Sequence, residues 1–261
     1  MPSLADTYDR FVFDLDGTLW RGPELLPHAA TVLGALRERA RPVVFMTNSP
    51  ILSQVDVADK LTRLGVPADA AAVVTVGRVV ARHLRERRIS TVFALCAAGL
   101  VEDLRVGGCD VVEAEAPLEA VGAVVVGRDD RLDFERLTVA CALVDSGAAL
   151  IATNRDARVP VQGGFVPGGG ALVAAVEFVT GVTAVALGKP ERPMMDEVDR
   201  ALGAPGTTLV VGDKLSADVL GAHSIGWGSA LVLTGATAPG ADLDPAPDHV
   251  LVDLAGLLLG S

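Results

Sequence analysis

The sequence predicts an α/β protein in which a doubly wound parallel sheet is interrupted by an inserted α/β domain. Short β-rich runs alternate with amphipathic segments of helix length, which is the rhythm of βαβ units. These runs are apolar on both faces, as expected where helices cover both sides of a parallel sheet. The rhythm resumes after a middle portion with its own strands and helices. With 261 residues, 50% of them hydrophobic, the chain can bury the core of one large or two modest domains.

The first portion, residues 1–79, opens with the apolar run FVFDL and continues with two helical segments of amphipathic spacing. The second of these helices ends at Gly65 and Pro67, which are common terminators. We expect strands at 11–15, 42–48 and 73–76, and helices at 28–39 and 53–64.

The middle portion, residues 80–183, is predicted to be the inserted domain, and residues 184–261 complete the first one. The basic run RHLRERR (82–88) is expected to be a solvated helix face. Within the insert we expect strands at 91–95, 110–113, 123–126 and 149–152, and helices near 98–105, 133–146 and 170–180. The last portion is predicted to contain helices at 191–202 and 216–225 and strands at 207–213, 229–235 and 249–252.

The composition argues against several kinds of partner. A net charge of −11 repels nucleic acid and anionic membranes, so we expect neither as a partner. The scattered Cys96, Cys109 and Cys141 show no zinc spacing and are expected to be reduced thiols. The first residues lack the basic and apolar regions of a signal peptide, and no apolar run could span a bilayer. We therefore expect a cytoplasmic protein.

Polar residues occur where four of the predicted strands end or a helix begins. The segments are DLDGT (14–18), TNS (47–49), GK (188–189) and GDKLSAD (212–218). One such segment is usually a turn or a helix cap. Four in matching positions indicate a binding site, because ligands of open parallel sheets bind beyond the carboxyl ends of the strands.

These segments offer the groups that a phosphoryl group requires. Asp14, Asp213 and Asp218 supply hard carboxylate oxygens of the kind that Mg²⁺ prefers. Lys189 supplies a positive charge. Hydroxyl and amide groups precede a helix whose N-terminal amides attract anions, and they come from Thr47, Asn48 and Ser49. The set predicts a phosphoryl group held between Mg²⁺ and Lys189, where positioning and charge neutralisation drive the chemistry.

The aspartate pair can divide the work of phosphoryl transfer. Alternation along a strand would put Asp14 and Asp16 on one side of the sheet. Asp14, kept ionised by the metal and by Lys189, can attack phosphorus, and Asp16 can protonate the leaving alcohol. Gly17 lets the backbone turn close to the phosphate. Trp20 either lines this pocket or belongs to the core.

The segments FVFDLDGTLW, TNS, GKP and GDKLSAD, in this order and spacing, resemble the haloacid dehalogenase (HAD) superfamily of phosphatases. The insert between TNS and GKP resembles the C2-capped (class IIA) branch related to NagD and to 4-nitrophenylphosphatase and phosphoglycolate phosphatase. Residues 152–181 are similar to the cap signature of that branch, and VLTGAT (232–237) matches its core. The resemblance implies a Rossmann-like core with a C2 cap at residues 80–183.

The resemblance also implies a role for each matching residue. Asp14 would be the nucleophile and Asp16 the acid/base. Mg²⁺ would be bound by the Asp14 carboxylate, the Asp16 main-chain carbonyl and Asp213, with Asp218 in support. The phosphate would be held by Thr47, Asn48 and Lys189, beside the candidate Ser49. Three departures from the family pattern leave all required groups in place: Ser49 stands where Asn is frequent, Ala217 where Thr is usual, and PGGG (167–170) where PGNG is commoner.

The cap is expected to select the substrate by contacting the leaving group and excluding water. Asn154, Arg155, Asp156 and Arg158 are candidates, because they follow a predicted strand. The alternative for this stretch is a solvated loop. The sequence is compatible with a homodimer formed through the cap and does not decide the oligomeric state.

We therefore predict a Mg²⁺-dependent phosphoric monoester phosphatase that works through an aspartyl-phosphate intermediate. The candidate substrates are sugar or polyol phosphates, glycerol phosphate, phosphoglycolate and nucleoside monophosphates. Two alternatives are a receiver-like or phosphate-binding signalling module with little turnover, and a phosphomutase. A receiver needs neither an acid/base such as Asp16 nor a large insert, which favours the phosphatase.

Overall fold

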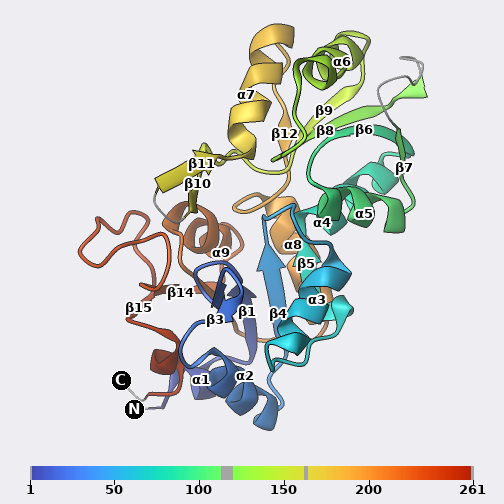
Figure 1. The fold of residues 1–261 in the computed structure, drawn as a ribbon. Helices are drawn as coiled ribbons and strands as arrows, with labels where there is room; N and C mark the ends of the chain where they lie inside the picture. Colours follow the sequence, from blue (N-terminus) through green and yellow to red (C-terminus); the bar gives the residue numbers. More distant parts are fainter. Residues whose placement is uncertain (1, 113–119, 162–163, 260–261) are drawn as a thin grey trace. The chain divides into compact units, whose positions relative to one another are not determined.

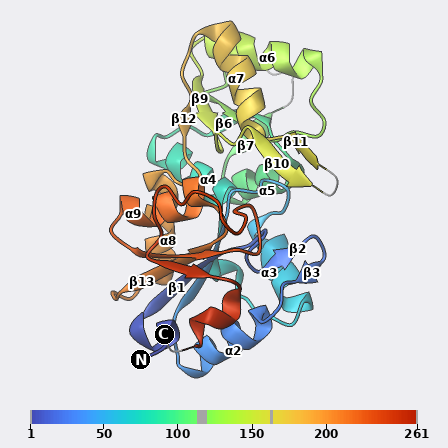
Figure 2. The same cartoon turned by 90° about the vertical axis from the view of Figure 1, so that its left-hand side faces the viewer.

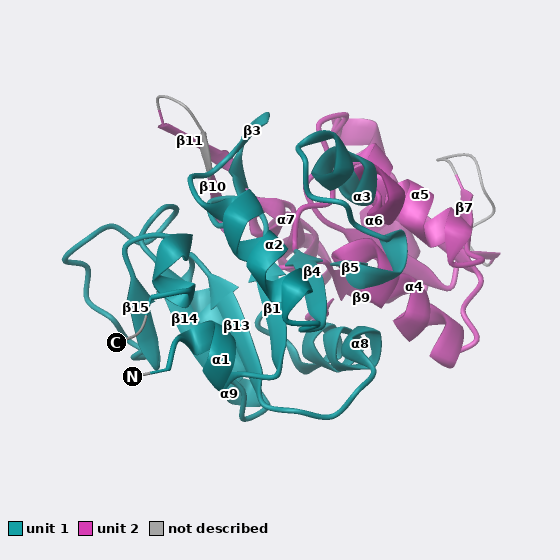
Figure 3. Cartoon of the chain, turned by 90° about the horizontal axis from the view of Figure 1, so that it is seen from below, with its two compact units in different colours: residues 1–47, 57–74, 189–261 teal, residues 48–56, 75–188 magenta. Residues whose placement is uncertain are grey.

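The computed structural model describes residues 2–112, 120–161 and 164–259. They separate into two compact units, coloured in Figure 3. Unit 1 comprises residues 1–47, 57–74 and 189–261, and unit 2 comprises residues 48–56 and 75–188. The boundaries expected for the insert, 80 and 183, fall inside the long segment of unit 2.

Unit 1 is built on a six-stranded sheet with the order β15-β14-β13-β1-β4-β5 (Figure 1). Strand β1 runs parallel to both β4 and β13, and β14 runs parallel to both β13 and β15. The chain adds strands on one side of β1 first and later on the other, so its winding reverses between β1 and β13. The strands are β1 (Arg10–Asp14), β4 (Val43–Thr47), β5 (Val73–Thr75), β13 (Thr208–Gly212), β14 (Gly228–Val232) and β15 (His249–Leu251).

Helices and a small hairpin complete this unit. Helix α8 packs against β4 and against α9, which contacts β14, while α1 and α2 both contact the short helix η4. The hairpin consists of β2 (Trp20–Arg21) and β3 (Glu24–Leu25), directly after the first aspartates. The helices are α1 (Leu4–Thr7), α2 (Ala29–Glu38), α8 (Arg192–Leu202), α9 (Leu220–Ser224) and η4 (Leu254–Leu257), with η1 (Ala70–Ala72) before β5 and the π-helical turn η3 (Leu215–Val219) before α9. Helix α3 (Gln54–Arg63) belongs to this unit from residue 57 onward, and its first three residues belong to unit 2.

Unit 2 contains a second parallel sheet, with the order β12-β9-β8-β6-β7. Helices α6 and α7 lie side by side in this unit (Figures 1 and 2). Its core joins the inner faces of β6 and β8 to those two helices through residues such as Phe93, Val124 and Val176. Burying an apolar side chain of this size contributes about 1.5–3 kcal/mol.

The remaining bounds of unit 2 are as follows. The strands are β6 (Thr91–Leu95), β7 (Asp110–Val112), β8 (Ala123–Val126), β9 (Ala149–Ala152) and β12 (Val185–Ala186), and the separate hairpin is β10 (Arg158–Val161) with β11 (Gly164–Pro167). The helices are α4 (Val76–Glu86), α5 (Ala98–Val106), α6 (Phe134–Asp145) and α7 (Gly169–Thr180).

The predicted α/β class is confirmed, and so are nearly all of the predicted strands and helices. Some details differ. The helix expected at 216–225 is a π-helical turn followed by a short α-helix, and the strand expected at 229–235 ends at Val232. Glu113, the last residue of the strand expected at 110–113, lies outside the described residues. In the described ranges we find no helix with the length and apolarity needed to cross a bilayer.

Candidate active site

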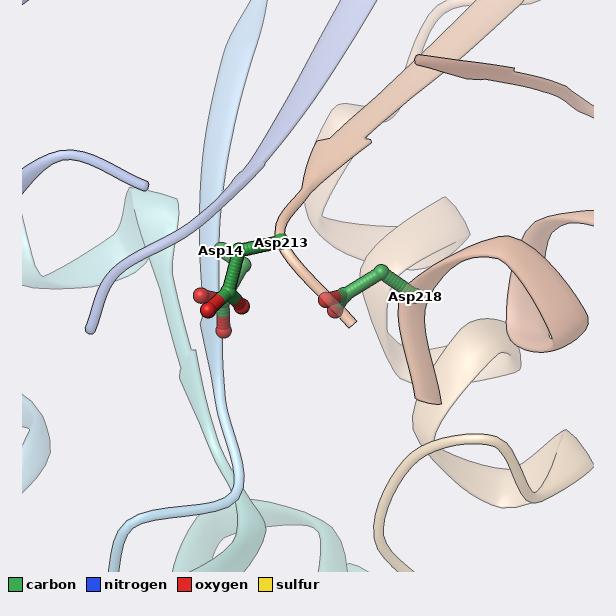
Figure 4. Close-up of side chains that lie close together, drawn as sticks. All are labelled: Asp14, Asp213 and Asp218. Carbon is green, nitrogen blue, oxygen red and sulfur yellow. The ribbon is translucent and has the colours of Figure 1, made fainter. Parts of the chain in front are cut away.

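Three aspartates meet at the carboxyl end of the sheet of unit 1, beside the reversal of its winding. Asp14 is the last residue of β1, Asp213 follows the neighbouring β13, and Asp218 lies on η3. All three are buried, and a carboxylate oxygen of each lies within 4.8 Å of the others. In Figure 4, Asp218 directs its carboxylate toward Asp14 and Asp213. The segments that the sequence analysis grouped thus supply three acids to one place.

Lys189 joins this cluster from the segment before α8. Its Nζ donates hydrogen bonds to Oδ1 of Asp14 and, over 2.7 Å, to Oδ1 of Asp218. The lysine side chain is buried together with both carboxylates. A charged lysine beside three ionised aspartates leaves the cluster with two negative charges in excess.

Burial and the charges of neighbouring groups shift the pKa values of residues in this cluster. Burial raises the pKa of Asp14 well above its ordinary value; Asp218 and Asp213 act in the same direction, and Lys189 offsets part of the effect. Burial, together with the charge of Asp218, also raises the pKa of Asp213 to about 6. Burial by itself lowers the pKa of Lys189, but Asp14 and Asp218 outweigh it, so the lysine stays protonated.

The donor set suits a divalent, oxygen-preferring cation. Carboxylate oxygens are the ligands that Mg²⁺ and Ca²⁺ prefer, and three converge here with excess negative charge. A cation held among them would stabilise the ionised carboxylates and so oppose the effect of burial on the pKa of Asp14 and of Asp213. Asp14, Asp213 and Asp218 therefore fit the metal that the sequence motifs imply.

The backbone around Asp213 approaches so closely that two positions accept only glycine. A Cβ on Gly17 would lie 2.3 Å from Oδ2 of Asp213, and one on Gly235 would lie 1.8 Å away. Gly17 also has φ +88°, in the left-handed region that favours glycine. The amide of Ala236 donates to Oδ2 of Asp213, and Thr234 Oγ1 donates to the carbonyl of Gly17 over 2.7 Å. These contacts hold the turn after β1 against the loop after β14.

Asp16 lies outside β1, which ends at Asp14, so strand alternation does not extend to it. Its side chain is exposed, and Oδ1 accepts a hydrogen bond of 2.8 Å from Nε1 of Trp20. Trp20 itself is buried. It therefore belongs to the core by burial and reaches the candidate site through its ring nitrogen.

Three of the residues expected at the phosphate, at positions 47–49, are divided between the two units. Thr47 is buried at the end of β4 in unit 1, and Asn48 and Ser49 begin a segment of unit 2. Within unit 2, the Asn48 carbonyl accepts a hydrogen bond of 3.4 Å from Nδ2 of Asn154.

The other residues proposed for substrate selection make contacts inside unit 2. Arg155 donates to both carboxylate oxygens of Glu177, at 3.2 and 2.8 Å, and to the carbonyl of Ala184. The Asp156 amide donates to Oδ1 of Asn154, and the guanidinium of Arg158 lies 4.2 Å from the centre of the Phe165 ring. These contacts give Arg155 and Arg158 a structural role in holding their own segments.

Sequence reasoning did not assign a role to Thr18, whose Oγ1 donates to Oδ2 of Asp14 over 3.2 Å. It also gives no role to the loop at 234–236, although VLTGAT (232–237) matches the core of the C2-capped branch. Both Thr18 and this loop could have been recognised only as small or hydroxyl residues beside a strand end. That pattern is a weak indication of a site, because ordinary turns use the same residues.

Comparison with known families matches both ends of the chain. Residues 11–110 match the family described as haloacid dehalogenase-like hydrolase, and residues 186–257 match the one described as HAD-hydrolase-like. The 5'-nucleotidase YutF of Bacillus subtilis (strain 168) is 32% identical over 233 residues, which cover 88% of this chain and 89% of that protein.

Solved structures agree over almost the whole length. A 4-nitrophenylphosphatase from Thermotoga maritima is 35% identical, with a TM-score of 0.87 and 98% of each chain covered. A glycerol phosphate phosphatase from Mycobacterium tuberculosis, solved in complex with magnesium, is 31% identical, with a TM-score of 0.85, and the match covers 99% of this chain and 78% of that one.

Proposed function

Because the chain belongs to the haloacid dehalogenase-like hydrolases, we propose that it is a Mg²⁺-dependent phosphatase that forms an aspartyl phosphate on Asp14. The observation that carries the proposal is the buried cluster of Asp14, Asp213 and Asp218 around Lys189. It combines a carboxylate nucleophile, a cation site and a fixed positive charge at the end of a parallel sheet.

The first step would transfer the phosphoryl group to the protein. An oxygen of Asp14 attacks phosphorus, and the bond between phosphorus and the ester oxygen breaks. Asp16 gives a proton to that oxygen, so the leaving group departs as an alcohol. Lys189, held against Asp14, neutralises charge on the transferring group.

The second step would return the protein to its starting state. A water molecule attacks the phosphorus of the aspartyl phosphate while Asp16 takes its proton. The bond between phosphorus and Asp14 breaks, and inorganic phosphate leaves. Asp14, Asp213 and the main-chain carbonyl of Asp16 would hold Mg²⁺, with Asp218 in support. When bound, Mg²⁺ neutralises negative charge on the phosphoryl oxygens.

The substrate class follows from the relatives at a coarse level. The relatives described above are named for a nucleotide, an aryl phosphate and glycerol phosphate. We propose that this chain likewise hydrolyses a small phosphate monoester: a sugar or polyol phosphate, glycerol phosphate, phosphoglycolate or a nucleoside monophosphate. The cap residues Asn154 and Asp156 remain candidates for selecting among these esters.

Phosphate release from a panel of these esters tests the proposal. We expect release with Mg²⁺, none with EDTA, and a loss on the order of 10⁴-fold or more in Asp14→Asn, because the amide is not a nucleophile. Asp145→Asn makes the same chemical change at an exposed position of α6 and should leave the rate unchanged. Folded, Mg²⁺-supplemented protein that releases no phosphate from any ester would overturn the phosphatase proposal. A stable phosphorylated Asp14 without turnover would favour the receiver-like alternative.

A further inference from the structure

The turn that carries Asp16 is closed by the hairpin that follows it. The amide of Gly17 donates to the carbonyl of Trp20 over 2.8 Å, and the amide of Trp20 donates to the carbonyl of Leu15 over 3.1 Å. Trp20 then pairs with Leu25 in the antiparallel hairpin. The backbone of Trp20 is therefore hydrogen-bonded to Leu15 and to Gly17, the two residues that flank Asp16.

The Trp20 side chain links this fixed backbone to the Asp16 carboxyl group. The tryptophan is 2% exposed, whereas Asp16 is exposed, and Nε1 donates to Oδ1 over 2.8 Å. An indole nitrogen can only donate, so Oδ1 serves as an acceptor whether Asp16 is protonated or ionised. The proton that Asp16 carries as an acid is thereby directed to its other oxygen, Oδ2.

Lys60 holds the indole ring in place. Its Nζ lies 3.8 Å from the centre of the Trp20 ring and donates to the carbonyl of Gly22, between the two hairpin strands, over 2.9 Å. An ammonium group over an indole face is attracted to the ring. A nearby positive charge also makes the indole N–H a stronger donor. Lysine, tryptophan and aspartate thus form one chain of contacts that ends at Asp16.

We propose that Trp20 is a positioning residue for general acid catalysis, which orients Asp16 so that Oδ2 gives its proton to the ester oxygen, and that Lys60 fixes the indole ring. The inference rests on the proposed phosphatase function. As the bond between phosphorus and oxygen breaks, the electron pair stays on the ester oxygen, which takes the Oδ2 proton. The attacking water later returns a proton to Asp16.

The leaving group distinguishes this role from a merely structural one. An alkoxide is a poor leaving group and needs the proton, whereas 4-nitrophenolate is a stable anion that leaves without one. Trp20→Phe keeps a buried ring and removes the donor. The test uses kcat/KM, which reports only the steps up to departure of the leaving group and leaves out the hydrolysis of the aspartyl phosphate that both esters share. We expect kcat/KM to fall by about 10- to 100-fold for the alkyl phosphate turned over fastest in the panel. We expect kcat/KM for 4-nitrophenyl phosphate to fall by less than about 3-fold, because general acid catalysis contributes little there.

Two further variants sharpen the test. Trp227→Phe makes the same exchange at the other tryptophan, whose ring lies 5.6 Å from the Arg10 guanidinium, and should change neither rate. Lys60→Met keeps the side-chain stem and removes the charge, and it should reproduce the selective loss more weakly, by about 3- to 10-fold on the alkyl ester.

The outcomes separate the two proposals. Equal losses of kcat/KM on both esters in Trp20→Phe, or no loss on either, would overturn the positioning role while leaving the phosphatase function intact. If the unaltered protein releases phosphate from neither ester, the proposed function itself fails. A loss confined to the alkyl ester supports both.

Discussion

Lys189 shows how strongly the cluster depends on one residue. It is buried and bonded to Asp14 and Asp218, so its charge compensates two carboxylates that have left water. Removing one partner of a buried ion pair is costly because the other partner keeps its desolvation penalty. The same charge is available to a phosphoryl group bound at Asp14. The positive charge of Lys189 is therefore needed both for the stability of the cluster and for catalysis.

We expect Lys189→Met to lower activity by about 10²- to 10³-fold, as the loss of a transition-state charge partner does. In EDTA it should also lower the free energy of unfolding by about 3–5 kcal/mol, since buried carboxylates are left unpaired. Mg²⁺ should reduce that loss, because the cation offsets the same charges. Urea denaturation of both proteins with EDTA and with Mg²⁺ checks this, with Lys189→Arg as the charge-retaining comparison. An unchanged stability in EDTA would show that the lysine does not compensate the cluster.

At the scale of elements, Asp103 of α5 joins the starts of two other helices. Its Oδ1 accepts from the amide of Gln54, the first residue of α3, over 2.8 Å. Its Oδ2 accepts from the hydroxyl of Thr75, which caps α4. A Cβ on Gly77 would lie 2.6 Å from this carboxylate, so the close approach requires glycine. One buried carboxylate thus ties three helices of the chain together.

This carboxylate should make stability depend on pH. Burial raises the pKa of Asp103 to about 6 from its ordinary value of 3.8. The folded state then binds the proton more tightly than the unfolded state, so the contribution is complete below pH ~4 and is lost as pH rises through about 6. The loss amounts to up to about 3 kcal/mol, since each tenfold change in proton affinity corresponds to about 1.4 kcal/mol.

The free energy of unfolding across this range tests the assignment. Without a bound cation, Asp14 and Asp213 add to the same decline, because burial raises their pKa values as well. In the presence of Mg²⁺, Asp103→Asn should make the decline between pH ~4 and ~6 shallower by up to about 3 kcal/mol, because the amide does not titrate. Asp145→Asn makes the same chemical change at an exposed position of α6 and should keep the decline of the unaltered protein. An equally steep decline in Asp103→Asn would assign the pH dependence to other groups.

At the scale of the whole molecule, long periodic segments were predictable and short ones were not. The run FVFDL and the segment 134–145 carry enough apolar residues to predict their type from sequence. The strands Trp20–Arg21 and Glu24–Leu25 have two residues each, too few for any periodicity, and they exist because the hairpin packs beside the Asp16 turn. Helix α4 begins at Val76, which was expected to end the strand 73–76. The apolar residues continue from strand to helix without a break, so the sequence does not mark the boundary.

The candidate site follows the same rule. The meeting of Asp14, Asp213 and Asp218 was predictable because strand ends in a parallel sheet share one edge. The contact between Trp20 and Asp16 was not, since it depends on a hairpin that the sequence does not signal. Nor was the pairing of Arg155 with Glu177, which is 22 residues away in the chain.

The central claim is that Asp14 carries the phosphoryl group during turnover, and trapping that group tests it most directly. Borohydride added during turnover reduces an acyl phosphate, and peptide mass spectrometry then locates the reduced residue. We predict reduction at Asp14 in the unaltered protein with Mg²⁺ and substrate, and none without substrate or in Asp14→Asn. Steady phosphate release with no reduced residue at position 14, or with one elsewhere, would contradict the account.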